Sequence, residues 1–182
     1  MTARIISVSG PPGAGKSTLV AGLARETGGT VVAYDDFEVI TSWLPEKVIA
    51  WLDAGAPLEE VIAPRLREAL LAQSGLVYFE TPFGRACPDT GGLITTSIWL
   101  ECPDDVALAR KIGALASYSH GNQGFAEILT GWLQAYEAFT RRALAVQREK
   151  VKPTADFSVA AEAAAGSVLS KVIFHLNQRK YL

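Results

Sequence analysis

The sequence is poor in cysteine and carries no strong excess of either charge. Cys87 and Cys102 are the only two cysteines among 182 residues. Their spacing forms neither a metal-type pair nor a disulfide framework, so we expect reduced thiols in an intracellular protein. The chain has 17 basic and 19 acidic residues, for a net charge of −2. This balance lacks the basic surface that nucleic-acid or membrane partners select.

Long apolar runs are also lacking. No stretch is apolar and charge-free for long enough to span a bilayer. The N-terminal residues show no basic segment followed by an apolar one, so we expect no secretory signal. These absences predict a cytoplasmic protein whose partners are small molecules rather than membranes or nucleic acids. We expect a monomer or homodimer, and the sequence does not decide between them.

What is present is an alternation of short apolar runs with longer helical patterns. With 49% hydrophobic residues, the chain is long enough for one domain over residues 1–182. Strand-length runs occupy 4–9, 30–34, 76–80, 97–101 and 156–160. Helical spacing is seen over 16–26, 44–54, 58–73, 104–114 and 125–149. The pattern predicts an α/β fold with a mainly parallel five-stranded sheet flanked by helices, and it predicts that the aromatic stripe of 125–139 is core.

The segment GPPGAGKST, residues 10–18, carries the most specific signal. It satisfies G-x-x-x-x-G-K-[ST] and lies between an apolar strand and a helix, as a phosphate-binding loop requires. Glycine allows backbone N–H groups to approach phosphate oxygens. Lys16 is suited to the β- and γ-phosphates and Ser17 to Mg²⁺. The predicted nucleotide contacts are Gly10, Pro11, Pro12, Gly13, Ala14, Gly15, Lys16, Ser17 and Thr18.

The phosphate loop alone does not separate kinases from GTPases and ATPases. A GTPase would carry N-K-x-D to bind guanine, and no such tetrapeptide occurs. The run 89–92 fits D-x-x-G, but the residues before it are turn-like rather than a strand. Large ATP-driven machines need a longer chain. A small phosphotransferase is therefore the leading class.

Three carboxylates lie where such an enzyme needs them. Asp35 and Asp36 follow the second apolar run, and Glu80 ends the third. Ligands of parallel α/β sheets bind at the carboxyl ends of strands. An acid there can orient or deprotonate an acceptor hydroxyl, and another can hold Mg²⁺ directly or through water. Glu80 suits the metal role; the aspartates could also merely cap the segment that follows.

The ordered set of the loop, Asp35-Asp36-Phe37 and Glu80 resembles the uridine kinase-like branch of the P-loop kinases. That branch includes uridine, nicotinamide riboside and pantothenate kinases. The resemblance implies a three-layer P-loop kinase fold, ATP and Mg²⁺ as cofactors, Asp35 as the acceptor-side base and Asp36 near the metal. Residues 153–159, PTADFSV, are similar to the element that introduces the family's last strand.

The family's lid helix usually begins with arginines that bind the phosphoryl groups. The run 104–112 resembles its start, which makes Arg110, with Lys111, the candidate for stabilising the transferred charge. The lid is expected over about 112–125. Its polar part, 117–124, contains no Arg or Lys, which departs from the family pattern. Arg141 and Arg142 are possible substitutes, and solvated surface positions are the alternative.

The acceptor pocket is expected to include the residues that follow Glu80. Arg85 is a candidate ligand for an anionic or carbonyl group, and Phe37, Trp43 and Phe83 are candidate apolar walls. The sequence therefore predicts a kinase that transfers the γ-phosphoryl group of ATP to a hydroxyl of a nucleoside-like or vitamin-like molecule. Alternatives are a nucleoside monophosphate kinase, an antibiotic phosphotransferase, or a nucleotide-binding regulatory module with little transfer. The acceptor, and ATP against GTP as donor, are left open.

Overall fold

The computed structural model describes residues 3–37, 40–118 and 124–182. Five parallel strands form one sheet in the order β2-β3-β1-β4-β5. The strands are β1 (Arg4–Ser9), β2 (Thr30–Ala33), β3 (Leu76–Glu80), β4 (Ile94–Glu101) and β5 (Phe157–Ala160). Helices cover both faces, so the predicted α/β fold and parallel sheet are confirmed.

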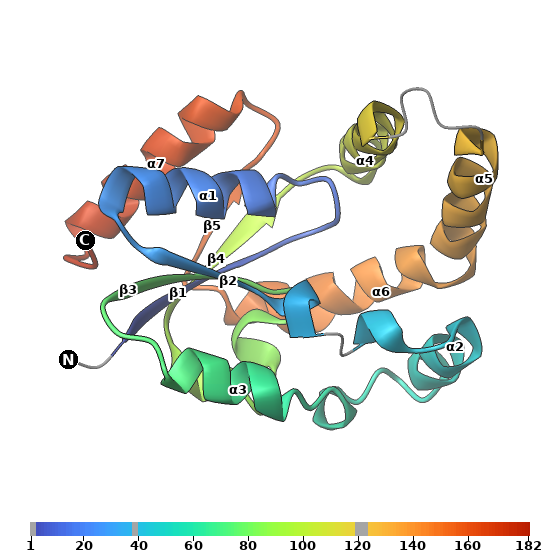
Figure 1. Cartoon of the computed structure of the whole chain (residues 1–182), viewed down its shortest axis with the longest axis horizontal. Coiled ribbons are helices and arrows are strands. Elements are labelled where there is room, and N and C mark those ends of the chain that lie inside the picture. The colour runs from blue at the N-terminus through green and yellow to red at the C-terminus, as the bar shows by residue number, and fades with distance from the viewer. Residues whose placement is uncertain (1–2, 38–39, 119–123) are drawn as a thin grey trace.

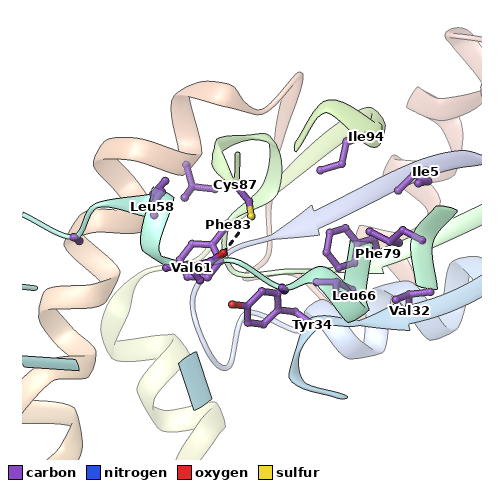
Figure 2. Close-up of a cluster of buried hydrophobic side chains, with 14 of the residues drawn as sticks. Ile5, Val32, Tyr34, Leu58, Val61, Leu66, Phe79, Phe83, Cys87 and Ile94 are labelled. Atoms are coloured by element: carbon purple, nitrogen blue, oxygen red, sulfur yellow. Dashed lines mark hydrogen bonds between the residues drawn. The ribbon is translucent and has the colours of Figure 1, made fainter. Parts of the chain in front are cut away.

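Two apolar cores lie on opposite faces of the sheet. On one face, α1 (Lys16–Thr27) and α7 (Ala165–Gln178) pack side by side (Figure 1). The other face carries α2 (Pro45–Asp53), α3 (Pro64–Leu71) and α6 (Arg141–Val146). Figure 2 shows the core of this second face, where Phe79, Leu66 and Tyr34 converge.

The strand register brings the candidate site residues to one edge. Val8 of β1 and Ala33 of β2 both pair with Glu80 of β3. The phosphate loop leaves β1 just beyond Val8, and the 3₁₀ turn Tyr34–Phe37 leaves β2 just beyond Ala33. The loop, the aspartate pair and Glu80 therefore meet at the carboxyl edge of the sheet.

Several element bounds differ from those expected. The segment predicted as one helix over 58–73 is a 3₁₀ turn, Leu58–Glu60, followed by α3, because Pro64 lacks an N–H and favours a helix start. β4 starts at Ile94 rather than residue 97. The helix α4 (Asp104–Tyr118) is longer than predicted.

The long helix predicted over 125–149 has regular and irregular parts. It contains α5 (Phe125–Ala135), a π-helical turn (Tyr136–Thr140), α6 and a second π-helical turn (Gln147–Val151). The aromatic stripe was expected to be core, but no residue of α5 is buried and Ile128 is 50% exposed. Only the C-terminal part, around Phe139, packs against the core of the α3 face. The expectation was wrong for α5 because this helix lies at the edge of the molecule, to one side of the sheet (Figure 1).

Candidate nucleotide and acceptor sites

A cavity of about 630 Å³ opens at the carboxyl edge of the sheet. The phosphate loop and the start of α1 form one end of it. The helix α4 and the loop that joins β5 to α7 form the other. Its lining residues include Gly13–Leu19, Glu80, Leu100, Arg110, Lys111, Ala114, Ala161–Ala165 and Val168.

The conformation of the phosphate loop requires glycine at two positions where its backbone comes close to the backbone of a neighbouring element. Gly13 has φ +89°, and a Cβ there would lie 2.0 Å from the Ala107 carbonyl oxygen of α4. Gly10 has φ +147°, and a Cβ there would lie 2.7 Å from the Leu100 carbonyl oxygen. Any larger side chain would displace the loop from α4 and β4. The sequence folds here as a tight turn that leads directly into the N-terminus of α1, the arrangement that favours bound anions.

Lys16 reaches back over the loop. Its Nζ donates hydrogen bonds to the carbonyl oxygens of Gly10 (3.0 Å) and Pro11 (3.2 Å). The side chain keeps partial exposure, but the loop encloses its ammonium, and this burial lowers the pKa of Lys16. The carboxylates of Glu80 and Asp35 oppose the effect, whereas Lys111 adds to it. Three charged groups from separate elements therefore surround Lys16.

Ser17 and Glu80 meet as expected. The Ser17 Oγ donates a hydrogen bond to Glu80 Oε1 at 2.9 Å. A hydroxyl and a carboxylate side by side form the hard oxygen donor set that Mg²⁺ prefers, with substrate phosphates completing the coordination. Among the described residues, no cluster of three or more His, Cys, Asp or Glu side chains forms a metal site independent of a nucleotide.

The two cations of α4 differ in their contacts. Arg110 lines the cavity, but its guanidinium donates to the carbonyl oxygens of Ala161 (2.6 Å) and Glu162 (3.0 Å), in the loop after β5. The role of Arg110 in stabilising the transferred phosphoryl group stays a prediction. Lys111 lies near enough to Lys16 to lower the pKa of that residue. Of the two, Lys111 is the better placed for the phosphates.

The aspartate pair lies in the 3₁₀ turn after β2. Asp35 and Asp36 are both exposed, and Asp35 is the one whose charge acts on Lys16. Asp36 does not line the nucleotide cavity. Asp35 does not line it either, so the metal role of Asp36 and the base role of Asp35 both stay predictions.

Phe83 and Arg85 are structural, which corrects their expected substrate roles. Phe83 is 4% exposed and packs edge-to-face on Tyr34, with ring centroids 5.4 Å apart (Figure 2). The Arg85 guanidinium donates to the carbonyls of Ile94 and Thr95, both at 2.7 Å, and to Asp156 Oδ2 at 2.8 Å. Burial alone would raise the pKa of Asp156, but hydrogen bonds from Arg85, the Ser97 N–H and Thr96 lower it below its usual value. Arg85 joins the turn after β3 to the starts of β4 and β5.

A second cavity, of about 300 Å³, lies apart from the residues that follow Glu80. Phe37 and Trp43 line it, and their role in binding an acceptor stays a prediction. Its cations are Lys47 of α2, whose Nζ lies 3.9 Å from the centroid of the Trp43 ring, and Arg65 of α3. Within the described part of the chain, Arg65 has no hydrogen bond or ion pair. Sequence reasoning missed both cations; the one available signal was an arginine directly after the helix-starting Pro64.

The expected lid lies partly outside the described residues. Residues 112–118 belong to α4, 124 precedes α5, and 119–123 are not described. Of the two possible substitute arginines, Arg142 forms an ion pair with Asp53 of α2 at 2.6 Å. The charge of Arg141 acts on Asp104 at the start of α4. Neither contact involves the phosphate loop.

Solved structures show the same fold over nearly the whole chain. A shikimate kinase from Aquifex aeolicus matches with TM-score 0.58 and 12% identity, covering 97% of this chain and 98% of that one. A gluconokinase from Sinorhizobium meliloti matches with TM-score 0.55 and 17% identity, covering 96% and 92%. A sugar kinase from Janibacter sp. HTCC2649 gives TM-score 0.55 and 20% identity, covering 96% and 95%. No family model matches the sequence, and no curated protein matches it.

The fold is thus that of the P-loop small-molecule kinases, in agreement with the resemblance seen in the sequence motifs. The neighbours named above phosphorylate polar small molecules, as their names state, and at these identities the likeness concerns the fold alone. Across the described residues, no helix has the length and apolarity to cross a membrane.

Proposed function

We propose that this protein is an ATP- and Mg²⁺-dependent kinase that transfers the γ-phosphoryl group to a hydroxyl of a small molecule. The observation that carries the proposal is the meeting of Lys16, Ser17 and Glu80 on one cavity at the carboxyl edge of the sheet, with Asp35 near enough for its charge to act on Lys16. The larger cavity takes the nucleotide. The smaller one begins at Phe37, two residues beyond Asp35, and takes the acceptor.

The transfer step follows from these positions. The acceptor hydroxyl oxygen forms a bond to the γ-phosphorus, and the bond from that phosphorus to the β,γ-bridging oxygen breaks to release ADP. Asp35 receives the hydroxyl proton. Lys16, released from the loop carbonyls, neutralises the β- and γ-phosphate oxygens, and Lys111 adds a second positive charge. Mg²⁺, held by Ser17 and Glu80, would draw charge from the phosphates.

The smaller cavity favours an acceptor with an anionic group. Two exposed cations, Lys47 and Arg65, come from different helices and lie around an apolar wall of Phe37 and Trp43. One carboxylate, that of Glu60, also lines this cavity, so the cations outnumber it. A guanidinium without a protein partner is suited to a carboxylate or phosphate through paired hydrogen bonds. The acceptor we propose is therefore a hydroxylated carboxylate, or a hydroxylated phosphate ester, with an apolar body.

The same cations keep a second function open. In a nucleoside monophosphate kinase the acceptor is itself a phosphate, and Arg65 with Lys47 would bind it. The two functions differ in Asp35, because a phosphate acceptor needs no base. Product identification with γ-labelled ATP against hydroxy acids, nucleosides and nucleoside monophosphates separates them. A labelled phosphomonoester that requires Asp35 supports the hydroxyl kinase, and a labelled diphosphate insensitive to Asp35→Asn supports the alternative.

A nucleotide-binding regulatory module would form no labelled product with any acceptor of the panel. That outcome, with nucleotide binding retained, would overturn both kinase assignments.

A further inference from the structure

The base end of the nucleotide cavity has an unusual set of hydrogen-bonding groups. This inference rests on the proposed function, in which the phosphates lie on residues 13–17. The base then lies at the far end, against Arg110, Ala114 and the loop Ala161–Ala165. Four of the five residues in that loop are alanine, so their side chains offer no polar atom to a base.

Most of the loop's carbonyl oxygens already have partners. Those of Ala161 and Glu162 accept the Arg110 guanidinium at 2.6 and 3.0 Å. The carbonyl of Ala164 accepts the N–H groups of Ser167 (2.9 Å) and Val168 (3.2 Å), at the start of α7. Backbone carbonyls are the acceptors that would receive the amino group of adenine. Here three of the four carbonyls over 161–164 already accept a hydrogen bond from the protein, and among the described residues only the Ala163 carbonyl has no partner.

The Glu162 carboxylate supplies a further acceptor at this end. The residue is exposed, and among the described residues its carboxylate has no hydrogen bond or ion pair. Glu162 lies near enough to Cys102 for its charge to act on that thiol. Burial is the main cause of the raised pKa of Cys102, and the charge of Glu162 raises it further. Arg110 Nη1 approaches the same thiol at 4.0 Å, so Glu162 and Arg110 flank one part of the cavity.

An ionised carboxylate only accepts hydrogen bonds, and this decides which purine it favours. Guanine presents two adjacent donors, N1–H and the N2 amino group, that match the two carboxylate oxygens. Adenine presents one donor, its N6 amino group, next to N1, which is an acceptor. The adenine N1 and a carboxylate oxygen would repel each other, because neither carries a hydrogen to donate. We infer that the donor site accepts guanine nucleotides at least as well as adenine nucleotides, and that Glu162 is the specificity-determining residue.

Binding measured without an acceptor tests this independently of transfer. Titration calorimetry with ADP, GDP and IDP in the presence of Mg²⁺ gives three dissociation constants for the wild-type chain. GDP is expected to bind at least as tightly as ADP, and IDP more weakly than GDP because it lacks the N2 amino group. Glu162→Gln should weaken GDP by about 10-fold, since a bidentate contact of this kind discriminates bases by that order, and should leave ADP unchanged or tighter.

Glu59→Gln is the matched control, because Glu59 is exposed in the Leu58–Glu60 turn and lines neither cavity. This variant should keep the wild-type ratio of GDP to ADP affinity. A wild-type chain that binds ADP tightly and GDP at least tenfold more weakly would overturn the inference alone, as would an unchanged ratio in Glu162→Gln. Failure of every nucleotide to bind would overturn the proposed function as well.

Discussion

The donor end and the acceptor end of the site are built in contrasting ways. The donor end is one contiguous segment, residues 10–18, held between β1 and α1 and packed against the backbone of α4. The acceptor end is assembled from the turn after β2, α2 and the start of α3, and its cations are exposed. If the proposed function holds, the general reaction is encoded by a local motif, whereas the substrate is selected by side chains distant in sequence.

The largest effect is expected at the donor end. Lys16→Ala removes the ammonium enclosed by the phosphate loop and should lower kcat/KM by about 10³-fold or more, because that charge stabilises the transferred phosphoryl group. Steady-state kinetics with ATP would measure it. Lys171→Ala, an exposed lysine of α7, is the control and should keep wild-type rates. Comparable losses in both variants would contradict a specific role for Lys16.

The next effect is expected where the two ends meet. Asp35→Asn keeps the size of the side chain but removes the base, so kcat should fall by about 10²- to 10⁴-fold while nucleotide affinity changes little. Parallel kinetics and nucleotide titration would separate the two quantities. Asp36→Asn should lower kcat less than Asp35→Asn does, since Asp35 and not Asp36 is among the charges that shift the pKa of Lys16. An Asp35→Asn variant with full transfer would show that the base is assigned wrongly.

A smaller effect is expected at the acceptor end. Arg65→Ala should raise the acceptor KM by about 10- to 100-fold with kcat nearly unchanged, because a charge-assisted hydrogen bond to the acceptor is lost in ground and transition states alike. Arg67→Ala is the matched control on the same helix, since Arg67 faces Asp89 at 3.6 Å. Equal acceptor KM values for wild-type and Arg65→Ala would move the acceptor out of this cavity.

The smallest effect concerns stability, away from both ends. The pKa of Asp156 is lowered in the folded state, so its contribution is present above its unfolded pKa and is lost as pH falls through the folded value. Stability to urea should therefore decline below about pH 4. Asp156→Asn should flatten that decline and reduce the free energy of unfolding at neutral pH by about 1 kcal/mol. An unaltered pH profile would show that the Arg85–Asp156 contact does not couple to folding.

The features that the sequence predicted correctly are those encoded by local motifs, and the features it missed depend on residues distant in sequence. The five strands, the phosphate loop and the meeting of Ser17 with Glu80 follow from local motifs and from the rule that parallel strands end at one edge, whereas the start of β4 was placed three residues too late. Arg85 could not be placed, because its partners lie up to 71 residues away, at Asp156. The exposure of α5 was missed because amphipathic spacing shows which face is apolar and not what covers it.

Arg110 and Arg65 illustrate the remaining difficulty. Arg110 was correctly placed on the nucleotide cavity, but its choice of partners depends on the loop after β5, about 50 residues later. The local sequence gives Arg65 only one signal, its place directly after the helix-starting Pro64. It becomes a candidate ligand only because the fold places α3 beside Phe37 and Trp43.

The most direct test of the central claim is a mass balance of the reaction. With ATP, Mg²⁺ and the best acceptor of the panel, phosphorus NMR would follow ADP, free phosphate and phosphomonoester together. If the protein is a kinase, ADP and phosphomonoester should form in equal amounts with little free phosphate, and Lys16→Ala should convert no ATP to ADP. ADP matched by free phosphate, or no ADP while the nucleotide still binds, would contradict it.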